Sequence, residues 1–241
     1  MAIGIRRRQF LLGLAVAAAT CATAEPVSAE SIAIIGTGRV AAALGPRLAG
    51  LGHDVIYGSR EPTRSEVREL VSATGARASA ASPRDAARGA DIVILAVPGT
   101  AVEAVVMSLG DLSGKIIIDP TNPTRRGEDG LVEHAVATSN AELIQELAPG
   151  AHVVKAFNAL SAQSMADPGS VGGPITIPLV GNDAAAKAAV AELVEGLGFE
   201  SMDLGPVRYA HVVEGMLVVW INARIERRPF DYYFRRPPQS N

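Results

Sequence analysis

The stretch SIAIIGTGRVAAALGPRLAGLGHDVIYGSR, residues 31–60, decides the fold. It opens with Ile32–Ile35, a short apolar run rich in β-branched residues, which is typical of a buried parallel strand. A glycine turn follows at once. Gly36 permits the tight turn, Gly38 lets the backbone approach a pyrophosphate, and small Ala41 lets the next helix pack closely. An apolar helix and a second β-branched run complete a β-α-β unit that predicts a bound dinucleotide.

The end of the second strand indicates which dinucleotide. That strand ends on Gly58, Ser59 and Arg60, and Arg64 follows one helical turn later. An NAD-specific site usually places Asp or Glu here to bind the ribose hydroxyls. A carboxylate would repel a 2′-phosphate, whereas a hydroxyl and a guanidinium bind one. The sequence therefore predicts NADP; the alternative for the two arginines is a solvated helix start.

The composition narrows the class of protein. With 241 residues, a net charge of −3 and 48% hydrophobic residues, the chain suits one or two compact α/β domains. It has no basic domain and only 4% aromatic residues, so nucleic-acid binding is not expected. No metal site is expected either, because the histidines are scattered and the one cysteine, Cys21, lies in the N-terminal segment.

The N-terminal segment, residues 1–29, has the pattern of a bacterial export signal. Arg6–Arg8 precede a run of small apolar residues that is short for a bilayer span. The run Arg-Arg-Gln-Phe-Leu resembles the twin-arginine signal. Cleavage is expected after Ala24 or Ala29, leaving a periplasmic or otherwise exported protein with no stable membrane anchor. The alternatives are an uncleaved anchoring helix, and a cytoplasmic protein if the signal is not used.

The remaining pattern alternates strands and helices, which predicts an α/β fold with a doubly wound, mostly parallel sheet. Further strands are expected at Ala76–Ser79, Asp91–Val97, Lys115–Asp119, His152–Asn158, Ile175–Val180 and Phe199–Asp203. Helices are expected at Arg64–Ser72, around Val102–Val106, at Ala184–Leu197 and at Val207–Ile225, with loops at Thr124–Gly130 and Met165–Gly173. The last helix is apolar on more than one face, which predicts burial in the chain's own core or in a homodimer.

Strand ends place further residues beside the cofactor. The carboxyl ends of parallel strands line the ligand crevice, so Ala96, Val97 and Pro98 should border the nicotinamide riboside, with Asn158 and Ala159 on a neighbouring strand. The alternative for Ala96–Pro98 is an ordinary exit from a strand into a loop.

Several motifs together resemble the NADPH-dependent coenzyme F420 reductase family, which includes the cytoplasmic domains of metalloreductases. They are IGTGRVAAALGPRLAGLGHDV, YGSR, the DPTNP loop, VVKAFNAL, PLVGND and GFESMDLGPV. The resemblance implies a Rossmann-type domain at residues 30–160 and a small C-terminal α/β extension at 161–226; the arginine-bearing residues 227–241 are expected to be a flexible tail. By the resemblance, Thr37, Gly38, Arg39, Val40, Ser59, Arg60 and Arg64 hold the NADP phosphates and ribose, and Val97, Val102, Asn122 and Ala159 flank the ribose and nicotinamide.

The resemblance also implies a reaction. Family members transfer a hydride directly between NADPH and a deazaflavin or flavin, which needs placement and exclusion of water but no acid, base or nucleophile. No catalytic triad, carboxylate pair or metal cluster stands out in the sequence, and no catalytic residue is expected. Arg125 and Arg126 could bind an acidic acceptor tail or form a solvated loop. Two other functions stay open: an NADP-binding protein without turnover, and an imine or hydroxyacid reductase of the β-hydroxyacid dehydrogenase type.

Overall fold

The computed structural model describes residues 29–230 and 233–237. The expected export signal therefore lies outside the described residues, apart from Ala29 at its end.

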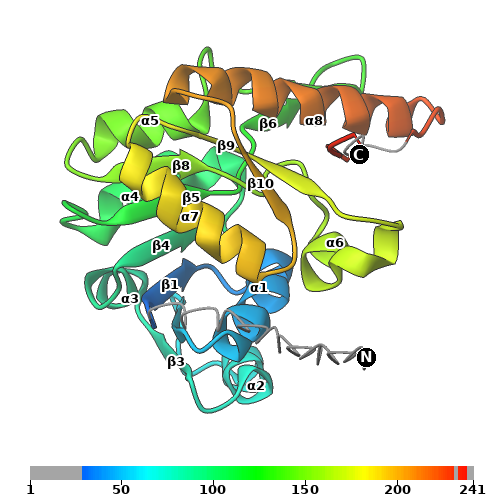
Figure 1. Ribbon diagram of the computed structural model, residues 1–241. Coiled ribbons are helices and arrows are strands. Elements are labelled where there is room, and N and C mark those ends of the chain that lie inside the picture. The colour runs from blue at the N-terminus through cyan, green and yellow to red at the C-terminus, as the bar shows by residue number, and fades with distance from the viewer. Residues whose placement is uncertain (1–28, 231–232, 238–241) are drawn as a thin grey trace, which may run out of the picture.

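One sheet of eight strands runs through the molecule in the order β10-β9-β8-β5-β4-β1-β2-β3 (Figure 1). Neighbouring strands are parallel except β8 and β9, which are antiparallel. Successive strands are added on one side of β1 and then, from β4 onward, on the other, which opens a crevice at the carboxyl ends of β1 and β4. The strands are β1 (Ser31–Ile35), β2 (Asp54–Gly58), β3 (Ala78–Ala81), β4 (Ile92–Leu95), β5 (Ile116–Asp119), β8 (His152–Lys155), β9 (Thr176–Gly181) and β10 (Glu200–Asp203).

Helices cover both faces of this sheet, because side chains along each buried strand alternate between two apolar layers. Ile32 and Ile34 face one layer, and Ala33 and Ile35 face the other. The first layer packs against α1 (Arg39–Gly50), α2 (Ser65–Thr74), α6 (Ala162–Ala166) and α7 (Ala184–Gly196). The second packs against α3 (Pro83–Arg88), α4 (Val102–Leu109), α5 (Asn140–Leu147) and α8 (Ala210–Ile225). The predicted doubly wound, mostly parallel α/β fold is confirmed.

The segment after residue 160 continues the same sheet. It contributes β9, α7 and β10, and β9 pairs with β8 through Val154 and Lys155. Three short 3₁₀ helices complete the connections: η1 (Gly99–Ala101), η2 (Pro168–Val171) and η3 (Val207–Tyr209).

Two segments expected to be loops are structured. Residues 124–130 contain β6 (Thr124–Arg126), which forms an antiparallel hairpin with β7 (Val132–His134). Arg125 in this hairpin pairs with Glu133, with its Nε 2.9 Å from Oε1. The segment from Met165 to Gly173 contains the end of α6 and then η2. The expectation of loops was wrong at both places, because elements this short are fixed by contacts distant in the sequence.

The last helix and the tail also differ from the expectation. In α8, Ala210 and Val213 are buried, but the side chains of Val212 and Val219 remain 58% and 62% exposed. Burial within the chain's own core was therefore the wrong alternative for most of this helix. In the expected flexible tail, Phe234 accepts a hydrogen bond from the backbone N–H of Thr176, and the Arg235 guanidinium donates to Val171 O.

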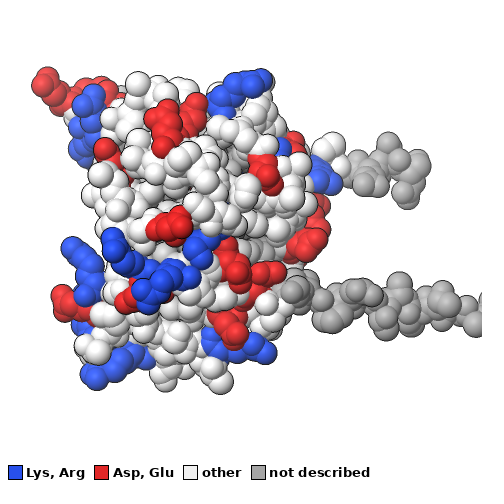
Figure 2. Space-filling view, turned by 90° about the vertical axis from the view of Figure 1, so that its left-hand side faces the viewer, with Lys and Arg blue, Asp and Glu red and all other residues white. Residues whose placement is uncertain are grey.

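The surface in Figure 2 carries interspersed acidic and basic side chains, with large uncharged areas between them. Within the described residues, no helix has the length and apolar character needed to cross a membrane.

Candidate cofactor site

The turn between β1 and α1 lies at the crevice, as the sequence predicts. Gly36 has a φ of +111°, and its N–H donates to the carbonyl oxygen of Gly58, at 2.9 Å. A Cβ atom on Gly36 would lie only 2.3 Å from the carbonyl oxygen of Ala96. Glycine is therefore required here on two counts, since both the backbone angle and the contact between the ends of β1 and β4 exclude a side chain.

The N-terminus of α1 offers an anion site. Gly38 is the N-cap residue, has an extended backbone, and makes no side-chain cap hydrogen bond. A Cβ built on Gly38 meets no atom within 4 Å, so there is open space in front of the first turn. Arg39 and Val40 begin the helix and offer their backbone N–H groups. Free N–H groups at the positive end of the helix dipole suit a pyrophosphate.

A cavity of about 650 Å³ lies beside this turn. It brings together many of the predicted residues from the ends of β1, β2 and β4: Gly36, Thr37, Gly38, Ser59, Arg60, Arg64, Ala96, Val97 and Pro98. The cavity is also lined by residues that were not predicted as site residues: Ile35, Gly58, Glu61, Pro83, Ala101, Ala104, Val105 and Ser108. The size, and the glycine turn at one wall, fit a nucleotide.

Ser59, Arg60 and Arg64 form the end of this cavity after β2. Ser59 is only 8% exposed, and its Oγ accepts a hydrogen bond from the Glu61 N–H at 3.2 Å. Arg60 is exposed, while the Nε of Arg64 lies 3.1 Å from Oε2 of Glu66. Glu61, which was not among the predicted site residues, adds one carboxylate to an otherwise basic cavity end.

Val102 does not reach the cavity. The resemblance implies that it flanks the nicotinamide, but its side chain is fully buried between α4 and the sheet. Helical periodicity explains the difference, because residues three or four apart share a face. Positions 101, 104, 105 and 108 face the cavity, whereas 102, 106 and 109 face the core.

Asn122, Asn158 and Ala159 lie outside the 650 Å³ cavity. Asn122 Nδ2 donates to the Asn158 carbonyl at 2.8 Å, and Asn158 Nδ2 donates to Asn122 Oδ1 at 3.0 Å, which joins the loops after β5 and β8. Phe157 precedes them with a φ of +63°, a backbone angle that is strained for an aromatic residue. These residues form a second part of the crevice edge.

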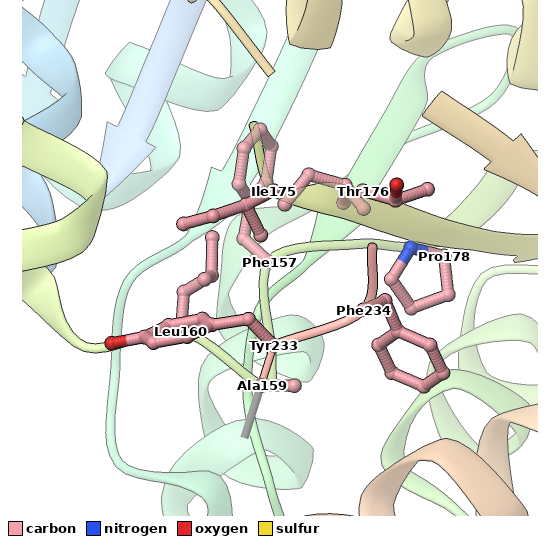
Figure 3. Close-up of a pocket in the computed structure, with 9 residues that line it drawn as sticks. Phe157, Ala159, Leu160, Ile175, Thr176, Pro178, Tyr233 and Phe234 are labelled. Atoms are coloured by element: carbon pink, nitrogen blue, oxygen red, sulfur yellow. The ribbon is translucent and has the colours of Figure 1, made fainter. Parts of the chain in front are cut away.

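Beyond this pair, Ala159 contributes to a small apolar pocket that the tail closes (Figure 3). Tyr233 and Phe234 of the tail lie across it from Phe157 and Ile175. The Tyr233 hydroxyl is 3.1 Å from Ser164 Oγ. The remaining volume of about 10 Å³ leaves space for roughly one water molecule, so the aromatic rings fill this pocket.

Metal ligands do not gather in the described part of the chain: no group of three or more His, Cys, Asp or Glu side chains is placed to hold an ion.

The doubly wound sheet, the glycine turn before an uncapped helix N-terminus and the cavity ending on Ser59 and Arg60 together define a dinucleotide-binding protein of the Rossmann class. Comparison with known proteins narrows the class. Residues 31–123 match the family model described as NADP oxidoreductase, coenzyme F420-dependent. The F420-dependent NADP reductase of Methanothermobacter thermautotrophicus is 31% identical over 219 residues, covering 84% of this chain and 92% of that protein. The chain therefore belongs to this family of NADP-dependent oxidoreductases, as its motifs predicted.

Other relatives agree with this assignment. The rat metalloreductase STEAP3 is 31% identical over 193 residues, which are 79% of this chain but 37% of the metalloreductase. The chain thus spans little more than a third of that relative. The crystal structure of a putative F420-dependent NADP reductase from Arthrobacter sp. FB24 superimposes with a TM-score of 0.78, at 34% identity, over 86% of this chain and all of that one. A reductive aminase from Aspergillus terreus in complex with NADPH shares the fold, with a TM-score of 0.61 at 20% identity.

Proposed function

We propose that this protein transfers a hydride directly between NADPH and a flat ring acceptor, a deazaflavin such as coenzyme F420 or a flavin. The names of two relatives that are matched over more than nine tenths of their length, both F420-dependent NADP reductases, support the acceptor class. The observation that carries the proposal is the difference between the two ends of the crevice: a nucleotide cavity that ends on Ser59, Arg60 and Arg64, and a loop junction whose edge is formed by the uncharged residues Asn122, Asn158 and Ala159.

The direction in which the dinucleotide lies in the crevice follows from the position of the basic residues. Ser59, Arg60 and Arg64 share one cavity with the outer face of α4, so this cavity suits the adenosine and its 2′-phosphate. The pyrophosphate then fits the N-terminus of α1 at Gly38. The nicotinamide must extend beyond Gly38, past Pro98, toward Asn122. This direction accounts for Asn122, Asn158 and Ala159 lying outside the nucleotide cavity.

Direct hydride transfer needs no acid, base or nucleophile among the side chains. NADPH supplies the hydride, and the acceptor takes that hydride and one proton from water, so that NADPH, acceptor and H⁺ give NADP⁺ and the reduced acceptor. The protein's part is to bind, to orient and to exclude water. The residues on the path toward the nicotinamide are suited to binding and to excluding water. Ala96, Val97 and Pro98 are apolar, and the side-chain amide groups of Asn122 and Asn158 are hydrogen-bonded to each other.

Stopped-flow oxidation of NADPH under anaerobic conditions tests the proposal with coenzyme F420, FMN, a ferric chelate and a cyclic imine as acceptors. The expected result is rapid oxidation with a ring acceptor and slow or no oxidation with the imine. Tight NADPH binding without oxidation by any acceptor would instead indicate a binding protein without turnover. Reduction of the imine alone would favour the β-hydroxyacid dehydrogenase type of reaction.

We further propose that the protein is exported through the twin-arginine route. This rests on the sequence of residues 1–29, and it implies that NADP is bound before export or supplied afterwards. Replacing Arg7 and Arg8 by lysine should retain the protein in the cytoplasm on cell fractionation. Intact-mass analysis of the parent protein should show cleavage after Ala24 or Ala29; an uncleaved chain would contradict the signal.

A further inference from the structure

A fully buried ion cluster lies beneath the loop junction of the crevice. Lys155 on β8, Asp119 on β5 and Glu214 on α8 have no exposed surface. Lys155 Nζ donates to Asp119 Oδ2 at 2.8 Å, to the Thr121 carbonyl at 2.5 Å, and to Glu214 Oε1. These three acceptors use all three ammonium hydrogens. Because burying charges is costly, a cluster in this position calls for an explanation beyond packing.

The cluster connects to the crevice through a short chain of hydrogen bonds. Asp119 Oδ1 accepts from the N–H of Thr121 at 2.8 Å and from its hydroxyl at 2.6 Å. The hydroxyl oxygen accepts in turn from Asn140 Nδ2 at 2.7 Å. The same Nδ2 donates to the Gly99 carbonyl at 2.9 Å. Gly99 directly follows Pro98, which lines the nucleotide cavity.

The loops at the end of this chain are in tight contact. A Cβ on Gly99 would lie 1.9 Å from the carbonyl oxygen of Asn122, so the loops after β4 and β5 touch backbone to backbone. Asn122 is bonded in turn to Asn158 after β8. Three strand ends are thereby fixed to one another above Lys155, at the place where the proposed function puts the nicotinamide.

We propose that Lys155 is a positioning residue that acts through Thr121 and Asn140 to fix the wall of the crevice at Gly99 and Asn122, and so orients the nicotinamide toward the acceptor. This inference rests on the proposed hydride transfer. Lys155 itself touches neither the cavity nor its contents, because it is completely buried.

A purely structural role for the cluster would be to attach α8 to the sheet. Glu214 and Lys155 suffice for that role, since their ion pair directly joins α8 to β8. The backbone N–H of Asn140 also donates to Glu214 Oε1, at 3.0 Å, so α5 is attached to α8 as well. The Thr121 hydroxyl takes part in none of these bonds to α8. Removing the Thr121 hydroxyl therefore distinguishes the two roles, attachment of α8 and positioning of the crevice wall, because the ion pairs of Lys155 remain.

The test compares Thr121→Val with Thr121→Ser, which keeps the hydroxyl, and with a matched control, Thr74→Val. The control also removes a hydroxyl with a hydrogen-bond partner, since Thr74 Oγ1 lies 2.7 Å from the Tyr57 hydroxyl on the far side of the sheet from the cluster. For each variant, NADPH affinity is measured by titration, nicotinamide immobilisation by fluorescence anisotropy of bound NADPH, and the hydride step by stopped flow with coenzyme F420.

Thr121→Val is expected to change the NADPH dissociation constant by less than about twofold, lower the anisotropy of the nicotinamide, and slow the hydride step at least about tenfold, because small displacements of reacting groups have large rate effects. Thr121→Ser and Thr74→Val should behave like the parent. Equal anisotropy and equal rates in all three variants would overturn the inference. Anisotropy needs no acceptor, so the inference remains testable even if the parent oxidises no NADPH.

Discussion

At the scale of single residues, selection of NADP depends on charge at the end of β2. The guanidinium of Arg64 forms an ion pair with Glu66, whereas Arg60 is exposed at the cavity. We therefore expect Arg60→Ala to raise the NADPH dissociation constant at least about tenfold, since a charge-assisted hydrogen bond contributes about 1.5–3 kcal/mol. NADH affinity should be unchanged. Fluorescence titration of both cofactors measures this, and equal affinity of the parent for NADH and NADPH would contradict the assignment.

Glu61 provides the matched control for that substitution. Its carboxylate lines the same cavity and opposes a bound phosphate. Glu61→Gln should leave NADPH affinity equal or tighter, in contrast to Arg60→Ala. A loss of affinity in both variants would show that the cavity end is sensitive to any change and that charge is not the cause.

Glu214 gives a pH-dependent prediction. Burial raises the pKa of its carboxyl from 4.5 to about 7, with Lys155 opposing the rise and Asp119 adding to it. One proton on Glu214 leaves the cluster of one ammonium and two carboxyls neutral. The folded protein thus keeps a proton that the unfolded chain releases between these pH values. The stabilising contribution is complete below pH 4.5 and is lost as the pH rises through about 7.

The Glu214→Gln variant should therefore lose less unfolding free energy than the parent between pH 5 and pH 7. The difference is expected to be about 2 kcal/mol over these two pH units, since one pH unit of differential proton binding is worth at most about 1.4 kcal/mol. Urea denaturation across this range measures it. Glu103→Gln, at an exposed position on α4, should keep the parent's pH dependence. A parallel pH dependence in parent and Glu214→Gln would contradict the raised pKa.

At the scale of elements, the turn between β1 and α1 contains two glycines with different roles: Gly36 is needed for the fold, and Gly38 for the approach of the cofactor. Gly36→Ala should destabilise the fold and abolish binding, because the φ of +111° and the carbonyl of Ala96 both exclude a Cβ. Gly38→Ala meets no steric obstacle in the free protein, so its melting temperature should fall little. It should nevertheless bind NADPH at least about tenfold more weakly, because the methyl group occupies the space in which the pyrophosphate approaches the helix.

Thermal melting and NADPH titration of the two variants measure this contrast. If Gly38→Ala kept the NADPH affinity of the parent, the pyrophosphate would have to bind away from the N-terminus of α1.

Most elements with strong local signals were predicted from the sequence, and the β6–β7 hairpin, which is set by distant contacts, was not. The apolar strands and the glycine turn are local features, and they agree with the structure. α5 was missed although Ser139 and Glu142 have the spacing of a capping box, and Ser139 Oγ accepts from the Glu142 N–H at 3.1 Å. The β6–β7 hairpin has no such signal, since Asn222 of α8 holds it through both backbone groups of Val132.

The buried cluster shows the same division. Asp119 and Lys155 each end an apolar strand, and they are register partners on β5 and β8. A charged residue at the end of an apolar strand can be read from the sequence. Its pairing depends on β5 and β8 being neighbours in the sheet, although β6, β7 and α5 separate them in the chain.

At the scale of the whole molecule, α8 leaves an apolar face uncovered. This helix is apolar on more than one face, but only part of it packs on the sheet, along one edge of the molecule (Figure 1). Val212 and Val219 are seven residues apart and therefore share its outward face, with Met216 between them. Helices that are apolar all round are normally buried. We therefore expect a second copy of the chain to cover this face in a homodimer.

Replacing both Val212 and Val219 by lysine should convert the dimer into a monomer, because two ammonium groups would have to be desolvated at the interface. Light scattering after size exclusion would then give the mass of one chain in place of two. The control is Met107→Lys on α4, an equally apolar and 67% exposed site on another surface, which should remain dimeric. A parent protein with the mass of a single chain at micromolar concentration would contradict the dimer. The outward face of α8 would then need a different partner to explain its apolar composition.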